Sequence, residues 1–126
     1  MRAFAIFIAV LVACSLAGCG KSKQEQIIGS WKDSSQKEFD STMTFNKDGS
    51  LNADVVLKTE AAPDHFKMTG TWKFESGKLI YTINHSEYKN EKFAGQTDTS
   101  TLNSIDEKSF TVTDANGMQH AYVRVN

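Results

Sequence analysis

The feature that most constrains the fold of this chain is a strict alternation of apolar and polar residues from His65 to Glu75. The segment reads HFKMTGTWKFE, with apolar side chains at every second position and one glycine among them. A period of two is the pattern of a strand with one buried face. Ser76-Gly77 then makes a two-residue turn, which defines the pairing with the next strand. The expected pairs are Phe74 with Leu79, Trp72 with Tyr81, Gly70 with Ile83 and Met68 with His85.

A second hairpin is expected at Lys47-Asp48-Gly49, where the neighbouring side chains decide the loop length. A two-residue turn would place Phe45 opposite Asn52. A three-residue loop, with Gly49 in the left-handed conformation, pairs Phe45 with Leu51 and keeps the apolar residues on one face. We therefore predict the three-residue loop.

A third hairpin is expected at Asn116-Gly117, a dipeptide that is the strongest short-range signal for a β-hairpin. A two-residue turn there pairs Val112 with Ala121. The same register places His120 and Tyr122 together on the face opposite Ala121.

The remaining sequence completes an all-β pattern, with a single proline and no run of helical periodicity. Eight strands joined by short turns make an antiparallel up-and-down meander. A meander with one apolar face buries it either by closing into a small barrel or by folding over as a sandwich. We favour the barrel, because closure also removes exposed strand edges. The expected strands span 27–33, 41–46, 50–60, 65–75, 78–88, 97–105, 108–114 and 117–125.

An apolar run near the start of the chain, residues 3–16, predicts an export signal. The run carries no charge, follows Arg2 and ends before the small residues Ala17 and Gly18, which is the layout of a secretory signal. At about 14 residues it is shorter than the roughly 20 that a transmembrane helix needs.

The four residues Leu16-Ala17-Gly18-Cys19 resemble the lipobox of bacterial lipoproteins. The resemblance implies that residues 1–18 are removed as a signal peptide and that Cys19 becomes a lipid anchor, acylated with palmitate-type chains. Two or three acyl chains make membrane attachment essentially permanent. Gly20 rather than Asp follows the cysteine, which by the enterobacterial sorting rule implies the outer membrane, with the protein facing the periplasm. Residues 19–26 are then the anchor and a short polar tether, and residues 27–126 are the barrel domain.

Composition limits what the mature domain can be. Removal of residues 1–18 leaves 108 of the 126 residues, discards Cys14 and lipidates Cys19, so that no disulfide remains. The domain must then be held together by its core. Loss of Arg2 leaves 13 of the 14 basic residues against 15 acidic ones. This balance argues against a nucleic-acid partner, which would require a basic patch.

A second resemblance rests on four motifs, which follow one another as in the small lipocalin-like domains of bacterial lipoproteins and span nearly all of 27–126. They are Ile28-Gly29-Ser30-Trp31, Thr44 to Gly49, Gly70-Thr71-Trp72-Lys73 with Lys78-Leu79, and the closing Tyr122-Val123-Arg124-Val125. In lipocalins a Gly-x-Trp on the first strand closes one barrel end, and an Arg on the last strand packs across the Trp ring. The resemblance implies that Trp31 and Arg124 form this pair. The chain lacks the long helix and much of the length of true lipocalins.

An eight-stranded barrel is just wide enough to be filled by side chains or to hold one small ligand. The inward candidates for binding a small apolar ligand are Phe66, Met68, Trp72, Tyr81, Ile83 and His85. The apolar ones serve a packed core equally well, which is the interpretation we favour. His85 either faces the interior, where an imidazole responds to ligand or pH, or lies at a strand end with its ring in solvent. We favour the second.

No cofactor, metal site or catalytic group is expected. His65, His85 and His120 lie on strands and faces that do not converge, and the Cys and His spacing does not fit a zinc site. Acidic pairs such as Asp106 and Glu107 fall in turns, and no serine stands in a Gly-x-Ser-x-Gly elbow. The sequence therefore argues against an enzyme.

Two classes of function remain. The first is an envelope lipoprotein that holds a small apolar ligand inside the barrel. The second is a protein-interaction lipoprotein, an inhibitor or an envelope accessory factor, that uses rim loops at 58–64 and 88–96. Phe93 in the second loop either plugs the barrel mouth, which we favour, or is an exposed anchor for a partner. An open cavity above roughly 300 Å³ would favour the first class.

Overall fold

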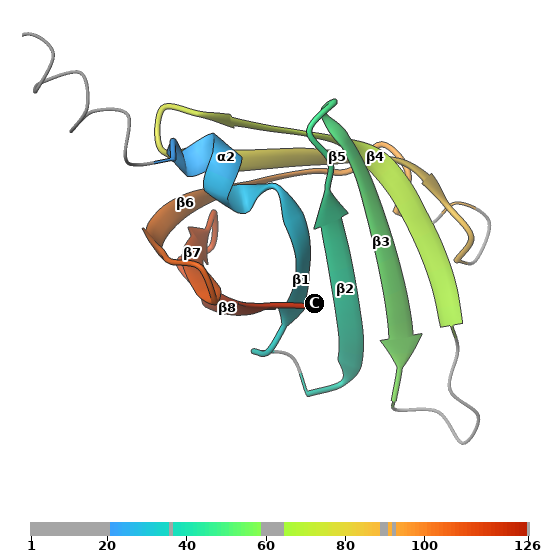
Figure 1. Cartoon of the computed structure of the whole chain (residues 1–126). Coiled ribbons are helices and arrows are strands. Elements are labelled where there is room, and N and C mark those ends of the chain that lie inside the picture. Colours follow the sequence, from blue (N-terminus) through green and yellow to red (C-terminus); the bar gives the residue numbers. More distant parts are fainter. Residues whose placement is uncertain (1–20, 36, 59–64, 89–90, 92, 126) are drawn as a thin grey trace, which may run out of the picture.

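The computed structural model describes residues 21–35, 37–58, 65–88, 91 and 93–125, which form one short helix and eight strands (Figure 1). Each strand is antiparallel to the next, and β8 returns beside β1 to close a barrel. The expected all-β meander and its closure into a barrel are confirmed. The elements are α2 (Lys23–Ile27), β1 (Gly29–Asp33), β2 (Phe39–Phe45), β3 (Ser50–Leu57), β4 (His65–Glu75), β5 (Lys78–Ser86), β6 (Thr97–Ile105), β7 (Ser109–Asp114) and β8 (Gln119–Arg124). Within this part of the chain no helix combines the length and the apolar content that a membrane crossing requires.

The apolar core is densest toward the barrel end that α2 covers. Trp31, Phe45, Leu51, Phe110 and Val112 are each 1% exposed or less. Trp31 packs edge-on against Phe110, with ring centroids 4.7 Å apart. Such edge contacts contribute about 0.5–1.5 kcal/mol beyond the burial of their area. This end of the barrel is a packed core.

The β2–β3 hairpin has the expected three-residue loop. Phe45 lies opposite Leu51, and the N–H of Asn46 donates to the carbonyl of Ser50 across the loop ends. Gly49 adopts a φ of 90°, which a residue with a Cβ rarely takes. The three-residue loop, which was predicted from the face on which the apolar side chains lie, is confirmed.

The β4–β5 hairpin has the expected register near its turn, with Phe74, Trp72 and Gly70 opposite Leu79, Tyr81 and Ile83. A glycine is required at position 70, because a Cβ there would overlap the carbonyl oxygen of Thr82 on β5. The register shifts between Thr69 and Gly70. Bulges of this kind bend a strand as closure of a barrel demands.

The expected pair of Met68 with His85 is wrong, because this bulge adds one residue to β5. Met68 instead pairs with Ser86, and Thr69 pairs with His85. A shift of one residue turns each later side chain to the other face. Ser86 is therefore buried, while the His85 side chain is 60% exposed, with its Nδ1 2.6 Å from Oε1 of Glu91. His85 lies outside the barrel with its ring in solvent, which is the alternative favoured from the sequence.

The expected register of the β7–β8 hairpin is also wrong, by one residue. Val112 pairs with His120 rather than with Ala121. His120 and Tyr122 therefore face the same side as Val112, which is the barrel interior. Val123 faces solvent and is 47% exposed.

The physical reason is a three-residue loop in place of the two-residue turn. The N–H of Asp114 donates to the carbonyl of Met118, and Gly117 takes a φ of 83°. One carboxylate oxygen of Asp114 also accepts the N–H groups of Asn116 and Met118. The segment 114–117 thus repeats the loop geometry of 46–49, which has the same order of a polar residue, any residue, Asp or Asn, and Gly.

Helix α2 lies over one end of the barrel (Figure 1), where a polar tether was expected up to residue 26 and the first strand was expected to begin at residue 27. The Ser22 side chain caps the helix by accepting the N–H of Glu25 at 3.2 Å. Ile27 at the other end of the helix is fully buried. The indole N–H of Trp31 donates to the Ile27 carbonyl at 2.7 Å. Residues 23–27 are therefore part of the folded barrel end, whereas residues 1–20, including Cys19, lie outside the described residues.

Arg124 ties this end together. Its guanidinium carbon lies 4.1 Å from the centre of the Trp31 ring, which is the contact that the lipocalin resemblance implies. The same guanidinium donates hydrogen bonds to the carbonyls of Gln26, Ile28 and Glu107. One side chain on the last strand therefore joins the first strand, the helix and the β6–β7 turn.

Arg124→Ala is expected to lower the free energy of unfolding by about 2–4 kcal/mol, because it removes a cation–π contact and hydrogen bonds to three carbonyls. Arg124→Lys should recover only part of the loss, since an ammonium cannot span the ring and reach all three carbonyls. Urea unfolding followed by tryptophan fluorescence measures both, with Lys108→Ala as the control. A loss under about 0.5 kcal/mol for Arg124→Ala, typical of a surface site, would contradict this role.

Candidate functional site

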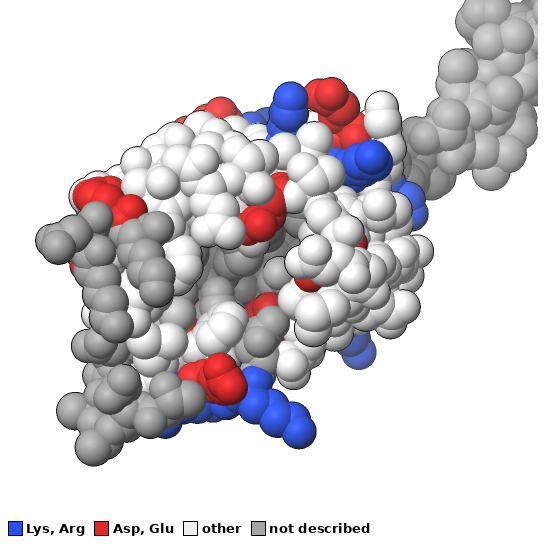
Figure 2. Space-filling model, turned by 180° about the vertical axis from the view of Figure 1, so that it is seen from behind, with Lys and Arg blue, Asp and Glu red and all other residues white. Residues whose placement is uncertain are grey.

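The barrel interior away from α2 contains a cavity of about 610 Å³. Seen from behind, the molecule is hollowed there, with acidic side chains around the hollow (Figure 2). Pockets for small ligands have volumes of roughly 300–1,000 Å³. The interior therefore divides into a packed end under α2 and an open end large enough for a small molecule.

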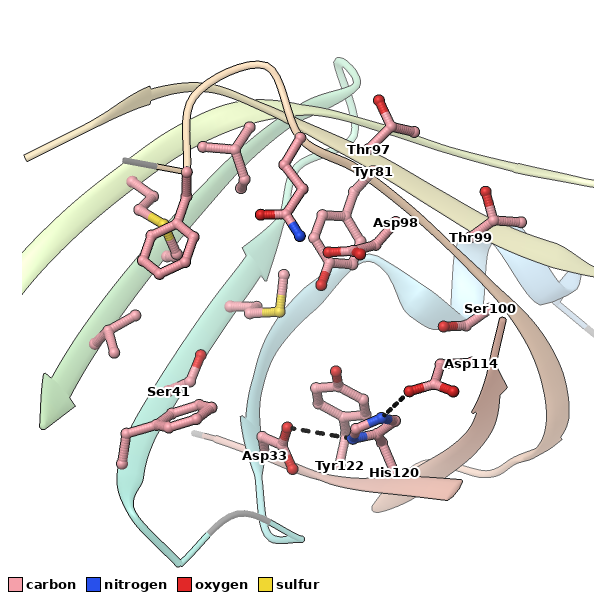
Figure 3. Close-up of a pocket in the computed structure, with 18 of the residues that line it drawn as sticks. Asp33, Ser41, Tyr81, Thr97, Asp98, Thr99, Ser100, Asp114, His120 and Tyr122 are labelled. Atoms are coloured by element: carbon pink, nitrogen blue, oxygen red, sulfur yellow. Dashed lines mark hydrogen bonds and ion pairs between the residues drawn. The ribbon is translucent and has the colours of Figure 1, made fainter. Parts of the chain in front are cut away.

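The cavity has two chemically different walls (Figure 3). The apolar wall is built by inward side chains of β2 to β5, among them Met43, Ala53, Val55, Leu57, Phe66, Met68 and Ile83. The polar wall comes mainly from the other strands, with Asp33 on β1, Asp98 and Ser100 on β6, Asp114 on β7, and His120 and Tyr122 on β8, together with Ser41 and Tyr81. The cavity is therefore amphipathic.

The structure separates the candidates named from the sequence into three groups. Phe66, Met68, Tyr81 and Ile83 line the cavity. Trp72 lies instead in the packed end, where its ring contacts Phe45 edge-on and its indole N–H donates to a backbone carbonyl at 2.8 Å. His85, as described above, lies outside the barrel.

His120 sits between two carboxylates on the polar wall. Its Nε2 lies 2.9 Å from Oδ2 of Asp114, and its Nδ1 lies 4.0 Å from Oδ2 of Asp33 (Figure 3). The hydrogen bond to His120, followed by that from the Met118 N–H, holds the pKa of Asp114 below its ordinary value. Asp33 is 7% exposed, and its other oxygen accepts the backbone N–H and the hydroxyl of Ser35.

Two tyrosines place hydroxyl groups in the same region. Burial, followed by the charges of Asp33 and Asp98, raises the pKa of Tyr122 well above its ordinary value. Burial also raises the pKa of Tyr81, with Tyr122 and Asp98 as further causes. Asp98 lies opposite Tyr81 across the β5–β6 pair. Both phenols therefore stay protonated at neutral pH and can donate hydrogen bonds.

Sequence reasoning missed most of the polar wall. Asp33 could have been found, because it is two residues after Trp31 and so shares its face. Asp98 lies in a strand of mostly Thr, Ser and Asn, where alternation gives no apolar face to mark the inside. His120 and Tyr122 were turned outward by the wrong register of their hairpin.

Phe93 packs over the apolar side of the cavity. Its ring is stacked against Tyr88 and Phe66, with centroids 5.7 Å and 6.4 Å away, and Tyr88 stacks on Phe66 at 4.6 Å. Phe93 is half-buried and lines the cavity. This position agrees with the plug favoured from the sequence.

The described residues contain no group of three or more His, Cys, Asp or Glu side chains arranged to hold a metal ion. The carboxylates of the polar wall therefore share one cavity without converging on one point.

Comparison with known protein families assigns the chain to one of them. A family model described as Domain of unknown function (DUF5004) matches residues 33–120, which is 88 of the 126 residues. The chain belongs to the DUF5004 family. No curated protein matches it. The DUF5004 match contains Asp33, Asp98, Asp114 and His120, so the carboxylates and the imidazole of the polar wall lie within the family domain, while Tyr122 lies just after its last matched residue.

Phe93→Ala is expected to lower the free energy of unfolding by about 1–2 kcal/mol, because the three-ring stack loses its outer member. The matched control is Met118→Ala, since Met118 is 60% exposed. Thermal unfolding followed by circular dichroism measures both. An unchanged midpoint for Phe93→Ala would show that the side chain does not plug the cavity.

Proposed function

We propose that this protein is a non-catalytic, small-molecule-binding lipoprotein of the bacterial envelope. In this proposal Cys19 carries the lipid anchor, the protein faces the periplasm from the outer membrane, and the barrel holds a ligand. The observation that carries the binding role is the cavity of about 610 Å³, since an eight-stranded barrel need not contain one.

The make-up of the cavity supports binding. Sites for small molecules combine apolar walls with a few placed polar groups that orient the ligand. Here Phe66, Met68 and Ile83 supply apolar area, while Tyr81 and Tyr122 supply hydroxyl groups. Cavities that stay empty are apolar, whereas polar groups in a cavity wall bond to a ligand or to water.

The proposal of an envelope lipoprotein is supported by the residues that precede the barrel. The lipobox-like Leu16-Ala17-Gly18-Cys19 is close in sequence to Ser22, which is the N-cap residue of α2. Only Gly20 and Lys21 separate Cys19 from Ser22. A lipid on Cys19 would therefore hold the α2 end of the barrel at the membrane and direct the open cavity end away from it.

Native mass spectrometry of the full-length chain, purified from the membranes of its own host in mild detergent, tests the binding role. We expect a small molecule to remain bound to the wild-type chain. Ala53→Phe should abolish that adduct, because Ala53 is 3% exposed and lines the cavity. Asn52→Phe is the matched control, since Asn52 is exposed on the same strand.

Two outcomes of this experiment would contradict the binding role. One is a wild-type chain with no small molecule bound, and the other is an adduct that survives in Ala53→Phe. A protein adduct in place of a small molecule would favour the alternative, in which loops on the barrel rim bind an envelope protein.

The anchor is tested by two cysteine variants in the same host. Cys19→Ser should lose the lipid-derived mass and leave the membrane fraction, because the acylated thiol is gone. Cys14→Ser should change neither property, since Cys14 lies in the segment that is removed. Membrane fractionation with intact mass measurement reads both, and a Cys19→Ser protein that keeps its lipid would refute the assignment.

A further inference from the structure

We propose that the cavity takes a ligand with an apolar body and a cationic, amine-type head group. This inference rests on the proposed function, because it specifies the class of molecule that the cavity binds. It is carried by the charge of the polar wall, by the atoms left available there, and by one hydroxyl group that faces the cavity from a buried side chain.

The charge that faces the cavity is negative. Asp33, Asp98 and Asp114 line it, and none of its described lining residues is a lysine or an arginine. His120 is the only lining side chain among these that can carry a positive charge, and one imidazolium cannot balance three carboxylates. An anionic head group would meet like charge in a medium of low dielectric constant, whereas a cation would be attracted.

Two of the three carboxylates keep acceptor capacity toward the cavity. Asp114 is occupied, because one oxygen accepts loop N–H groups and the other contacts His120. Asp33 uses one oxygen for Ser35, and its other oxygen is 4.0 Å from the nearest His120 nitrogen. Asp98 accepts a hydrogen bond from the Tyr81 hydroxyl, which leaves further lone pairs on the carboxylate, and it forms no ion pair with a Lys, Arg or His in the described part of the chain.

The Tyr122 hydroxyl adds an independent indication of a ligand. Tyr122 is 8% exposed, and its ring is fixed by stacking on Phe110 at 4.6 Å. The hydroxyl points into the cavity and is open to it (Figure 3), and it makes no hydrogen bond to another described residue. Polar groups on deeply buried side chains nearly always have a partner, so this hydroxyl must take one from whatever occupies the cavity. An ammonium N–H lying between Tyr122, Asp33 and Asp98 would supply it.

The spread of these groups favours an organic cation over a metal ion. A metal ion requires ligands that converge on one point, and among the described residues no such group of three exists. An ammonium group has several N–H donors that point in different directions. The apolar wall formed by Phe66, Met68 and their neighbours then covers the rest of the molecule.

The test is calorimetric titration of the full-length protein in lipid nanodiscs, with empty nanodiscs as the blank. The probes are 4-phenylbutylamine, 4-phenylbutanol and 4-phenylbutyrate, which share an apolar body and differ in head-group charge. We expect the amine to bind about tenfold more tightly than the alcohol, since a hydrogen bond to a charged group contributes about 1.5–3 kcal/mol. The carboxylate should bind most weakly of the three.

Two variants link that preference to the polar wall. Asp98→Asn should reduce the preference for the amine over the alcohol to about threefold or less, because it removes the negative charge and keeps the shape of the side chain. Tyr122→Phe should weaken amine binding about fivefold while it keeps the ring stack on Phe110, and it serves as the second variant should Asp98→Asn fail to fold. Asp54→Asn removes the same charge from a side chain that is 54% exposed outside the barrel, and should leave all three affinities unchanged.

The outcomes separate this inference from the function on which it rests. Equal binding of all three probes, tighter binding of the carboxylate, or an amine preference that survives both Asp98→Asn and Tyr122→Phe would overturn the cationic ligand while binding in the cavity stands. Absence of binding by all three probes would overturn the cavity as a binding site, and the inference with it.

Discussion

The contact of Arg124 with Trp31 is the interaction on which the rest of this barrel depends. It lies where β8 meets β1, so it fastens the two strands that must pair for the barrel to close. Gly29 makes room for it, because a Cβ at that position would lie 2.5 Å from Nη1 of Arg124 and the φ of Gly29 is +135°. The Gly-x-Trp motif and the arginine of the last strand therefore act together to join β8 to β1. Because the contact of Trp31 with Arg124 closes the barrel at the packed end, the opposite end need not be filled by side chains for the barrel to hold together.

The separation of the barrel into a packed end and an open end explains how a small domain can contain a cavity with charged walls. The packed end holds most of the fully buried aromatic and aliphatic side chains, including Phe45, Leu51 and Phe110. Buried polar groups are costly unless they have partners. At the open end Asp114 and His120 satisfy each other, whereas Asp33, Asp98 and Tyr122 keep polar atoms directed at the cavity. The stability of the packed end thus permits polar groups that face an open cavity at the other end.

Much of the fold could be predicted from the sequence, because alternation determines which face of each strand is buried. The pairing of β4 with β5 near its turn followed from that rule together with the turn at Ser76-Gly77, and the loop at 47–49 followed from the rule itself. The two errors have one cause, which is an extra residue that shifts a register. The bulge beyond Gly70 has no sequence signal strong enough to locate it, and it moved His85 outside. Asn116-Gly117 indicates a two-residue turn, but hydrogen bonds from the loop to Asp114 stabilise the longer one.

The candidate site was harder to predict than the fold for a related reason. An apolar cavity wall obeys the same alternation as a core, so Phe66, Met68 and Ile83 were placed correctly without distinguishing a cavity from a packed interior. The polar wall has no such pattern, and two of its members depend on the β7–β8 register. A cavity can therefore be recognised only in the folded structure, where strands distant in sequence are brought together.

The decisive measurement is a high-resolution crystal structure of the protein as purified from its host. We expect an open cavity with an ordered small molecule or water within hydrogen-bond distance of the Tyr122 hydroxyl, between Asp33 and Asp98. An interior filled by protein side chains, with the Tyr122 hydroxyl bonded to another part of the chain, would contradict this expectation.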